Sequence, residues 1–221
     1  MNTFAQFSAS LNEALERLVR SVEPSLAVVS SRRQGAGAGP GSSGAGIIWS
    51  RDGLILTNAH VVPGRSAVVR LHDEREFDAR LVGRDPEVDL ALLEIEAHDL
   101  PALRVAGGLP RVGEMVFAFG HPWGQRDSVS SGVVSALGSV RTRGRRGSLR
   151  VVRSDVPLAP GNSGGPLVNG AGEMVGINAM IIGGDQSISI PATVAREFVA
   201  QVLPGREVSA SQPEPVTEEV L

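Results

Sequence analysis

The 221-residue chain has no cysteine, no lysine and few aromatic residues, and these absences narrow what it can be. Without cysteine there is no disulfide, no thiolate nucleophile and no thiolate metal site. All 21 basic residues are arginine, and the net charge of −3 creates no overall field that would attract nucleic acid or an anionic membrane. No apolar run reaches the length of a membrane span.

Glycine and proline are abundant instead. The 27 glycines and 14 prolines exceed the share in an average protein by roughly half. With only 4% aromatic residues, this composition favours many short strands joined by turns over a bundle of long helices. The 42% of apolar and 20% of charged residues are typical of a globular chain and exclude a mostly disordered or fibrous one.

Residues 1–23 have the pattern of an amphipathic helix. Apolar side chains recur at intervals of three and four, at Phe4, Phe7, Leu11, Leu15, Leu18 and Val22. Charged residues interrupt the segment, so it has neither the basic start nor the unbroken apolar stretch of a secretory signal. The sequence therefore predicts a cytoplasmic protein. Three roles for the helix stay open: packing on its own domain, a subunit contact through Phe4 and Phe7, and membrane-surface binding, which its non-basic polar face disfavours.

Short strand-like stretches follow, separated by turn residues. A first series comprises 26–30, 46–49, 54–57, 66–71, 76–83 and 90–95, and a second 114–119, 128–137, 149–154, 166–168, 173–179 and 186–190. Because no helical pattern intervenes, the spacing predicts β-barrels or sandwiches. Pro191 then precedes a helical pattern over 192–203.

These patterns divide the chain into five parts. They are an amphipathic helix at 1–23, a first β lobe at 24–100, a connector at 101–112, a second β lobe with its helix at 113–203, and a tail at 204–221. The stretch 33–46, rich in glycine and serine, is predicted to be a flexible loop. The tail is polar and acidic with further prolines, which predicts disorder.

The most informative stretch is Gly-Asn-Ser-Gly-Gly-Pro at 161–166. Four of its six residues are glycine or proline, so the backbone bends into conformations that most residues avoid. A serine between glycines is unshielded, and successive N–H groups in such a turn can converge on one point, as an oxyanion hole requires. Taken alone, the stretch is equally well a glycine-rich turn in which Ser163 is incidental.

The order of residues along the chain separates two kinds of serine hydrolase. Gly161-x-Ser163-x-Gly165 also matches the nucleophile elbow of α/β-hydrolases, but those enzymes need a histidine after the serine. All the histidines here precede Ser163: His60, His72, His98 and His121. Only the order His–Asp–Ser stays open.

His60 and Asp89 are the candidate partners of Ser163. His60 follows the apolar strand at 54–56, among small and β-branched residues that can hold an imidazole, although such a histidine alone is more often structural. Asp89 opens an apolar strand that we expect to carry its carboxylate into the interior, where an imidazole N–H and backbone donors would satisfy it. Taken alone, Asp89 is also a plausible strand-start cap.

Together these stretches resemble the trypsin-like serine peptidases, and among them the protease domain of the HtrA/Deg family. The matching stretches are 57–62, 89–93, 120–124, 131–138, 155–167, 175–178 and 190–191 with the helix that follows. The resemblance covers roughly residues 24–203, in order. It implies an all-β fold of two six-stranded antiparallel β-barrels, chymotrypsin-like, with a helix at each end and the catalytic site in the cleft between the barrels.

The resemblance also implies a serine endopeptidase that cleaves unfolded or misfolded polypeptides through an acyl-enzyme. Ser163 is the expected nucleophile, His60 the base and then the acid, and Asp89 the residue that orients the imidazole. The expected oxyanion hole comprises Gly161, Asn162 and Ser163. No metal and no cofactor is expected.

Substrate selection is expected at three residues, Leu158, Ile181 and Gln186, which the resemblance places around the primary pocket. Aliphatic walls favour small or medium apolar P1 side chains. If Asp185 reached the floor of the pocket it would favour arginine or lysine instead.

Other features depart from that family or stay open. We expect neither a PDZ module after the protease domain nor a leader or anchor before it, and the loop between Ile182 and Ser187 is short. Family members commonly assemble as trimers through N-terminal aromatic residues, a role open to Phe4 and Phe7.

Six arginines cluster near one another in the second β lobe, at 141, 143, 145, 146, 150 and 153. We expect them to lie on a solvated hairpin. The alternatives are that the cluster binds an acidic partner, that it binds the acidic tail of the chain or, least of all, that it contacts nucleic acid.

Two further functions stay open. One is a non-catalytic chaperone-like or peptide-binding protein that keeps the protease fold with an inactive oxyanion hole. The other is an acyl hydrolase that acts on esters only.

Overall fold

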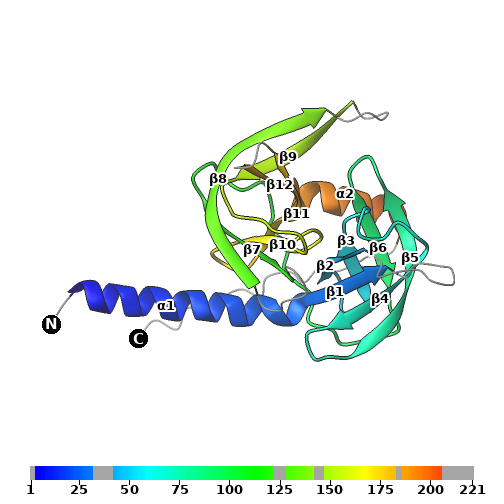
Figure 1. Cartoon of the computed structure of the whole chain (residues 1–221), viewed down its shortest axis with the longest axis horizontal. Coiled ribbons are helices and arrows are strands. Elements are labelled where there is room, and N and C mark those ends of the chain that lie inside the picture. The colour runs from blue at the N-terminus through cyan, green and yellow to red at the C-terminus, as the bar shows by residue number, and fades with distance from the viewer. Residues whose placement is uncertain (1–2, 32–41, 122–127, 142–146, 183–185, 206–221) are drawn as a thin grey trace.

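Two closed six-stranded antiparallel barrels lie side by side, with one helix before the first and one after the second (Figure 1). The computed structural model describes residues 3–31, 42–121, 128–141, 147–182 and 186–205, and of residues 180–182 the backbone alone. The fold class expected from the sequence, a chymotrypsin-like pair of barrels with two helices, is confirmed.

The first barrel has the strand order β1-β2-β3-β6-β5-β4. Its strands are β1 (Leu26–Ser31), β2 (Ser43–Ile48), β3 (Leu54–Thr57), β4 (Ser66–Leu71), β5 (Glu76–Asp85) and β6 (Leu90–Glu94). Strand β3 is buried along its whole length, and three of its four residues are apolar because both of its faces are covered. Ile55 packs inside the barrel, whereas Leu54 and Leu56 belong to the larger core that extends to the second barrel and the C-terminal helix.

The second barrel has the order β10-β11-β12-β9-β8-β7. Its strands are β7 (Met115–Gly120), β8 (Ser128–Arg141), β9 (Ser148–Ser154), β10 (Pro166–Asn169), β11 (Met174–Ile182) and β12 (Gln186–Pro191). Strand β8 continues four residues beyond the predicted end at 137, because its ladder with β9 extends to the pair Arg141–Ser148. Arg141 and Arg150 are exposed on this hairpin, whereas Arg143, Arg145 and Arg146 lie outside the described residues.

Both helices join the core that the barrels share. Helix α2 (Ala192–Val202) buries Val194, Phe198 and Val199 against it. Helix α1 (Thr3–Val22) continues into a 3-10 turn, Glu23–Ser25, and buries only Leu18 and Val22.

The rest of α1 extends away from the barrels (Figure 1). Phe4 and Phe7 are 75% and 65% exposed. The apolar stripe predicted over the whole helix is therefore packed at its C-terminal end and exposed at its N-terminal end. No helix in the described part of the chain is long and apolar enough to cross a membrane.

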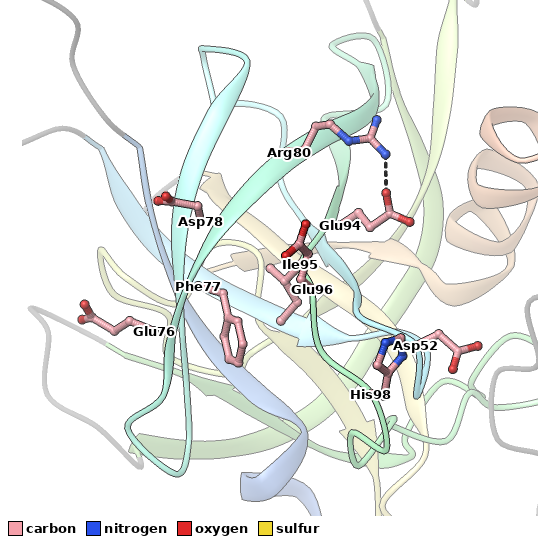
Figure 2. Close-up of a pocket in the computed structure, with 9 residues that line it drawn as sticks. All are labelled: Asp52, Glu76, Phe77, Asp78, Arg80, Glu94, Ile95, Glu96 and His98. Carbon is pink, nitrogen blue, oxygen red and sulfur yellow. Dashed lines mark hydrogen bonds and ion pairs between the residues drawn. The ribbon is translucent and has the colours of Figure 1, made fainter.

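A groove of about 1130 Å³ lies on the first barrel (Figure 2). Carboxylates on β5, on β6 and its extension, and at Asp52 surround an apolar floor that contains Phe77 and Ile95, and Arg80 pairs with Glu94 across one side. None of the residues that line it is a predicted site residue. The flexible loop predicted at 33–46 is wrong at its C-terminal end, because residues 43–46 pair with β1 as part of β2. Residues 33–41 of that loop and residues 206–221 of the predicted disordered tail lie outside the described residues.

Candidate active site

The structure joins His60 and Asp89 through two hydrogen bonds. The Asp89 carboxylate accepts the His60 backbone N–H at 3.0 Å through one oxygen and contacts His60 Nδ1 at 2.8 Å through the other. Because a carboxylate is an acceptor, this contact places the imidazole proton on Nδ1 and leaves Nε2 as the basic nitrogen. The hydrogen bond with Asp89 raises the pKa of His60, partial burial opposes the rise, and the negative charge of Asp89 adds to it.

The location of this pair differs in detail from the expectation. His60 lies in the turn after β3, with its side chain 51% exposed. Asp89 has a positive φ of 56°, and its side chain is 22% exposed instead of entering the interior. The left-handed backbone turns the carboxylate toward the 58–60 segment before the chain enters β6, so Asp89 meets its imidazole near the surface.

The serine lies directly after a tight turn. The Asn162 N–H donates to the Ala159 carbonyl at 3.0 Å, with Pro160 and Gly161 as the two central residues. Gly161 has a φ of 107°, which with proline before it is the pattern of a type II turn. A residue with a Cβ would be strained at this position, which is why glycine occupies it.

Backbone hydrogen bonds use three of the five amides at residues 161–165. Gly164 N–H donates to the Asn178 carbonyl at 2.9 Å, and Gly165 N–H donates to the Asn162 carbonyl at 3.0 Å. With the Asn162 amide used in the turn, the Gly161 and Ser163 amides are those that donate to no group among the described residues. Two amides of the same short segment are thus available to a ligand, whereas Asn162 contributes no free backbone donor.

A contact between the barrels places the serine beside the histidine segment. The Ser163 carbonyl accepts the Ala45 N–H at 2.8 Å, which ties the serine to β2. At Gly164 an added Cβ would lie 2.2 Å from the Ala45 oxygen and 2.3 Å from Thr57 Oγ1, so only glycine fits. Thr57 is three residues before His60, and this close packing therefore brings the two predicted catalytic segments together.

The Ser163 hydroxyl donates a hydrogen bond to the Ala179 carbonyl at 3.3 Å. In the described part of the chain it makes no hydrogen bond to His60. The distance is at the long end for a hydroxyl donor, so the bond is weak and rotation about one side-chain torsion would release it.

Of the three predicted pocket residues, the structure describes the side chains of Leu158 and Gln186 but only the backbone of Ile181. Leu158 is partly buried against the core of the second barrel. Its segment is anchored by Ser130 Oγ, which donates to the Pro157 carbonyl at 2.7 Å, and by Ser187 Oγ, which donates to the Val156 carbonyl at 2.6 Å. Gln186 is the first residue of β12 and pairs with Ile182 of β11. Ile181 is the residue before Ile182 on β11. The Ile181 side chain and Asp185 lie outside what the structure describes.

Two buried asparagines, Asn178 and Asn58, lie in stretches that match the family but were not predicted as site residues. Asn178 donates from Nδ2 to the Pro166 carbonyl at 3.0 Å and the Phe119 carbonyl at 3.3 Å, and it accepts from Ser189 Oγ at 3.2 Å. It thereby connects the serine segment to its neighbouring strands. Asn58 is equally buried, beside His60. The sequence pattern that could have identified them is a polar residue next to an apolar strand. Such a residue is expected to be buried and therefore to need hydrogen-bond partners.

No group of three or more metal-ligating side chains comes together within the described ranges. The chemistry that the site can support is that of its own residues: a hydroxyl, an imidazole with one basic nitrogen, a carboxylate and two free amides.

A His–Asp pair on the first barrel and a glycine-flanked serine on the second are the arrangement of the chymotrypsin-like two-barrel proteins. The chain belongs to the trypsin-like peptidase domain family, whose profile matches residues 44–177. The resemblance to the HtrA/Deg family is confirmed by its relatives.

Two curated relatives are named probable periplasmic serine endoprotease DegP-like. The one from Pseudomonas fulva is 44% identical over 175 residues, covering 76% of this chain and 36% of the relative. The one from Pseudomonas savastanoi pv. phaseolicola is 42% identical over 206 residues, covering 88% of this chain and 42% of the relative. The chain thus spans only about two fifths of the length of these relatives.

A solved structure, the serine endoprotease from Yersinia pestis, superposes with a TM-score of 0.73 at 31% identity. The match covers 85% of this chain and 65% of that one.

The names of the relatives overturn one expectation. These relatives are named probable periplasmic endoproteases, and the prediction of a cytoplasmic protein is therefore wrong. It rested on the lack of a secretory-signal pattern in residues 1–23 and of a membrane span, and such an absence does not determine the compartment.

Proposed function

We propose that this chain is the protease domain of an HtrA/Deg-type serine endopeptidase, with Ser163, His60 and Asp89 as its catalytic triad. The observation that carries the proposal is the Asp89 carboxylate bound to both His60 N and Nδ1, on a segment packed against the serine turn. Family membership and the DegP-like relatives support the same class of activity.

In the proposed mechanism the hydrogen bond from Ser163 Oγ to the Ala179 carbonyl breaks first. Ser163 Oγ then attacks the scissile carbonyl while His60 Nε2 takes the hydroxyl proton. Asp89 stabilises the imidazolium, which then protonates the leaving amine. Water, deprotonated by His60, releases the acyl group from the serine. The raised pKa of His60 suits this role, because the imidazolium is the form that Asp89 stabilises.

The Gly161 and Ser163 amides are the proposed oxyanion donors. Each such donor is worth roughly 3–4 kcal/mol in the transition state of comparable enzymes. The type II turn at Gly161 and the absence of another acceptor for either amide among the described residues support a hole that is formed at rest.

One observation favours the second candidate, a chaperone-like or peptide-binding protein without catalysis. The Ser163 hydroxyl donates to Ala179 and not to His60. If that hydrogen bond persisted with substrate bound, the nucleophile would not be activated.

We propose unfolded polypeptides as substrates, cleaved after small or medium apolar residues. The partly buried aliphatic side chain of Leu158 supports this preference. Peptides that differ only in P1 valine or arginine test it: the valine peptide is expected to have the higher kcat/KM, and a preference for arginine would contradict it. The periplasmic names of the relatives support a periplasmic location for this proposed activity.

We also propose a homotrimer that assembles through the N-terminal helix, because Phe4 and Phe7 are exposed on a stripe whose other end is buried. Sedimentation of the wild type and of the Phe4→Ser/Phe7→Ser variant tests this proposal. A wild type that sediments as a monomer would contradict it.

Casein cleavage separates the two candidate functions. The wild type is expected to degrade unfolded casein, and Ser163→Ala is expected to abolish turnover. A wild type that suppresses aggregation of a denatured protein without cutting it would support the non-catalytic candidate. Equal casein cleavage by Ser163→Ala in a clean preparation would refute the assignment of the nucleophile. Turnover of an ester without any peptide cleavage would indicate an ester hydrolase.

A further inference from the structure

Four hydrogen bonds connect three consecutive residues to Asp89. Two of them are the carboxylate contacts with His60. The other two go to the Asp89 main-chain carbonyl, which accepts the Ala59 N–H at 3.1 Å and the Asn58 side-chain N–H at 2.9 Å. The 58–60 segment thus holds Asp89 by its main chain and by its side chain together.

The main-chain half of this arrangement matters because of the conformation of Asp89. Its φ of 56° lies in the left-handed region, which is disfavoured for a residue with a Cβ. The same backbone turn aims the carboxylate at both His60 N and Nδ1. Relaxation of Asp89 to an ordinary conformation would therefore move the carboxylate relative to the imidazole, even with every catalytic side chain still present.

Asn58 is an unusual residue to find at this position. It is fully buried, and its side-chain oxygen is buried without a hydrogen-bond partner in the structure as described. The assignment of its two amide atoms is fixed, because the Asp89 carbonyl can only accept and must face Nδ2. A buried acceptor without a partner destabilises a protein, so an apolar side chain of similar volume would serve packing better. The Asn58 amide group is thus explained by the bond to Asp89.

We propose that Asn58 is a positioning residue of the acid–base pair, which holds the Asp89 main chain in the left-handed conformation that lets one carboxylate bridge His60 N and Nδ1. Asn58 acts through Asp89 and does not contact substrate. The inference rests on the proposed function of the site.

The first test compares Asn58→Ala and Asn58→Leu with Asn169→Ala. Asn169 is a matched control because its side chain also bonds backbone groups, accepting the Ala171 and Glu173 amides at 3.0 Å each in the β10–β11 turn. Both Asn58 variants are expected to lose at least about tenfold in kcat with KM within twofold, whereas Asn169→Ala stays within twofold in both. Since leucine fills the volume without an N–H, full activity of Asn58→Leu would show that packing alone matters and would overturn the proposal.

The second test does not depend on turnover. In the Ser163→Ala background, NMR titration of the imidazole protons gives the pKa of His60, with the resonance assigned by its loss in His60→Gln. Adding Asn58→Ala is expected to lower this pKa toward the usual value, because the Asp89 hydrogen bond is the main cause of the rise. Adding Asn169→Ala is expected to leave it unchanged.

An unchanged His60 titration in folded Asn58→Ala overturns the proposal. Near-UV circular dichroism identifies a variant that does not fold, and Asn58→Leu, which fills the volume without a donor, then takes its place under the same criteria. A shifted titration together with an inert wild type supports the positioning role and refutes the peptidase. The failures of the two proposals are thereby distinguishable.

Discussion

The two barrels contribute to the site in different ways. On the first, His60 and Asp89 are bound to each other at 2.8 Å and 3.0 Å, at the ends of strands that are buried on both faces. On the second, Ser163 lies after a glycine turn, and its hydroxyl makes one weak bond of 3.3 Å. The proposed acid–base pair is therefore assembled by the first barrel alone, whereas the position of Ser163, the proposed nucleophile, depends on how its turn packs against β2 and β3.

The largest loss of activity is expected when the contact between Asp89 and His60 on the first barrel is broken. Asp89→Asn replaces one carboxylate oxygen with an N–H group, so the imidazole loses the acceptor that keeps its proton on Nδ1. We expect kcat to fall about 10⁴-fold, as for the corresponding change in related enzymes, with little loss of stability. Steady-state kinetics on a chromogenic peptide measures this. A loss below tenfold would mean that Asp89 does not orient the base.

A smaller effect is expected where the contact between the barrels is broken. Gly164→Ala puts a Cβ against the Ala45 oxygen and Thr57 Oγ1 in a residue with a φ of 86°. We expect a loss of about 2 kcal/mol or more in the free energy of unfolding and a 10²-fold or greater loss of activity, since the serine must move. Denaturant titration and peptide kinetics measure the two effects.

Gly170→Ala is the control for that substitution. Gly170 lies in the turn after β10, and an added Cβ would have nothing within 4 Å. It is expected to change neither stability nor activity measurably. If both alanine variants behaved like the wild type, the packing of Gly164 against the first barrel would not determine the position of the nucleophile.

The smallest effect is a shift along the pH axis. His60 must be neutral to act as base, and its pKa is raised above the usual value of about 6.5 by Asp89. The activity is therefore lost as pH falls through a midpoint above 6.5, and the acid limb of kcat/KM reports that midpoint for the free enzyme. In Asp89→Asn the midpoint of the residual activity is expected at lower pH. An acid limb that stays in place in this variant would assign the limb to another group.

The same shift affects stability in the opposite sense. A raised pKa means that the folded state binds the His60 proton more tightly than the unfolded state. The stabilisation is fully present below pH 6.5 and is lost as pH rises through the folded pKa. Activity and this part of the stability thus change in opposite directions over the same pH range, which urea titrations at several pH values can follow.

The strands could be read from the sequence because alternation, turn residues and β-branched runs are local signals. The predicted bounds of β3 and β4 match those observed, and the others differ by a few residues. The candidate triad could be predicted for a different reason. All the histidines precede Ser163, and this order excluded the α/β-hydrolases and left only the order His–Asp–Ser. The assignment of these three residues to one catalytic triad came from the resemblance and stays a proposal.

The remaining features depend on contacts between distant segments. The left-handed backbone of Asp89 and its exposure follow from how the 58–60 segment lies around it, and no local pattern encodes that arrangement. The bond between Ala45 and Ser163 joins residues more than a hundred positions apart. Helix α1 shows a related limit: a continuous apolar stripe predicted a helix, but not that its N-terminal half would lie away from the barrels.

The central claim is that Ser163 is a nucleophile activated by the Asp89–His60 pair of the other barrel. Reaction with a fluorophosphonate, followed by peptide mapping in a mass spectrometer, tests it most directly. A single adduct on Ser163 is expected in the wild type, with a much slower reaction in Asp89→Asn. No adduct on Ser163, or equal rates in the two proteins, would contradict it.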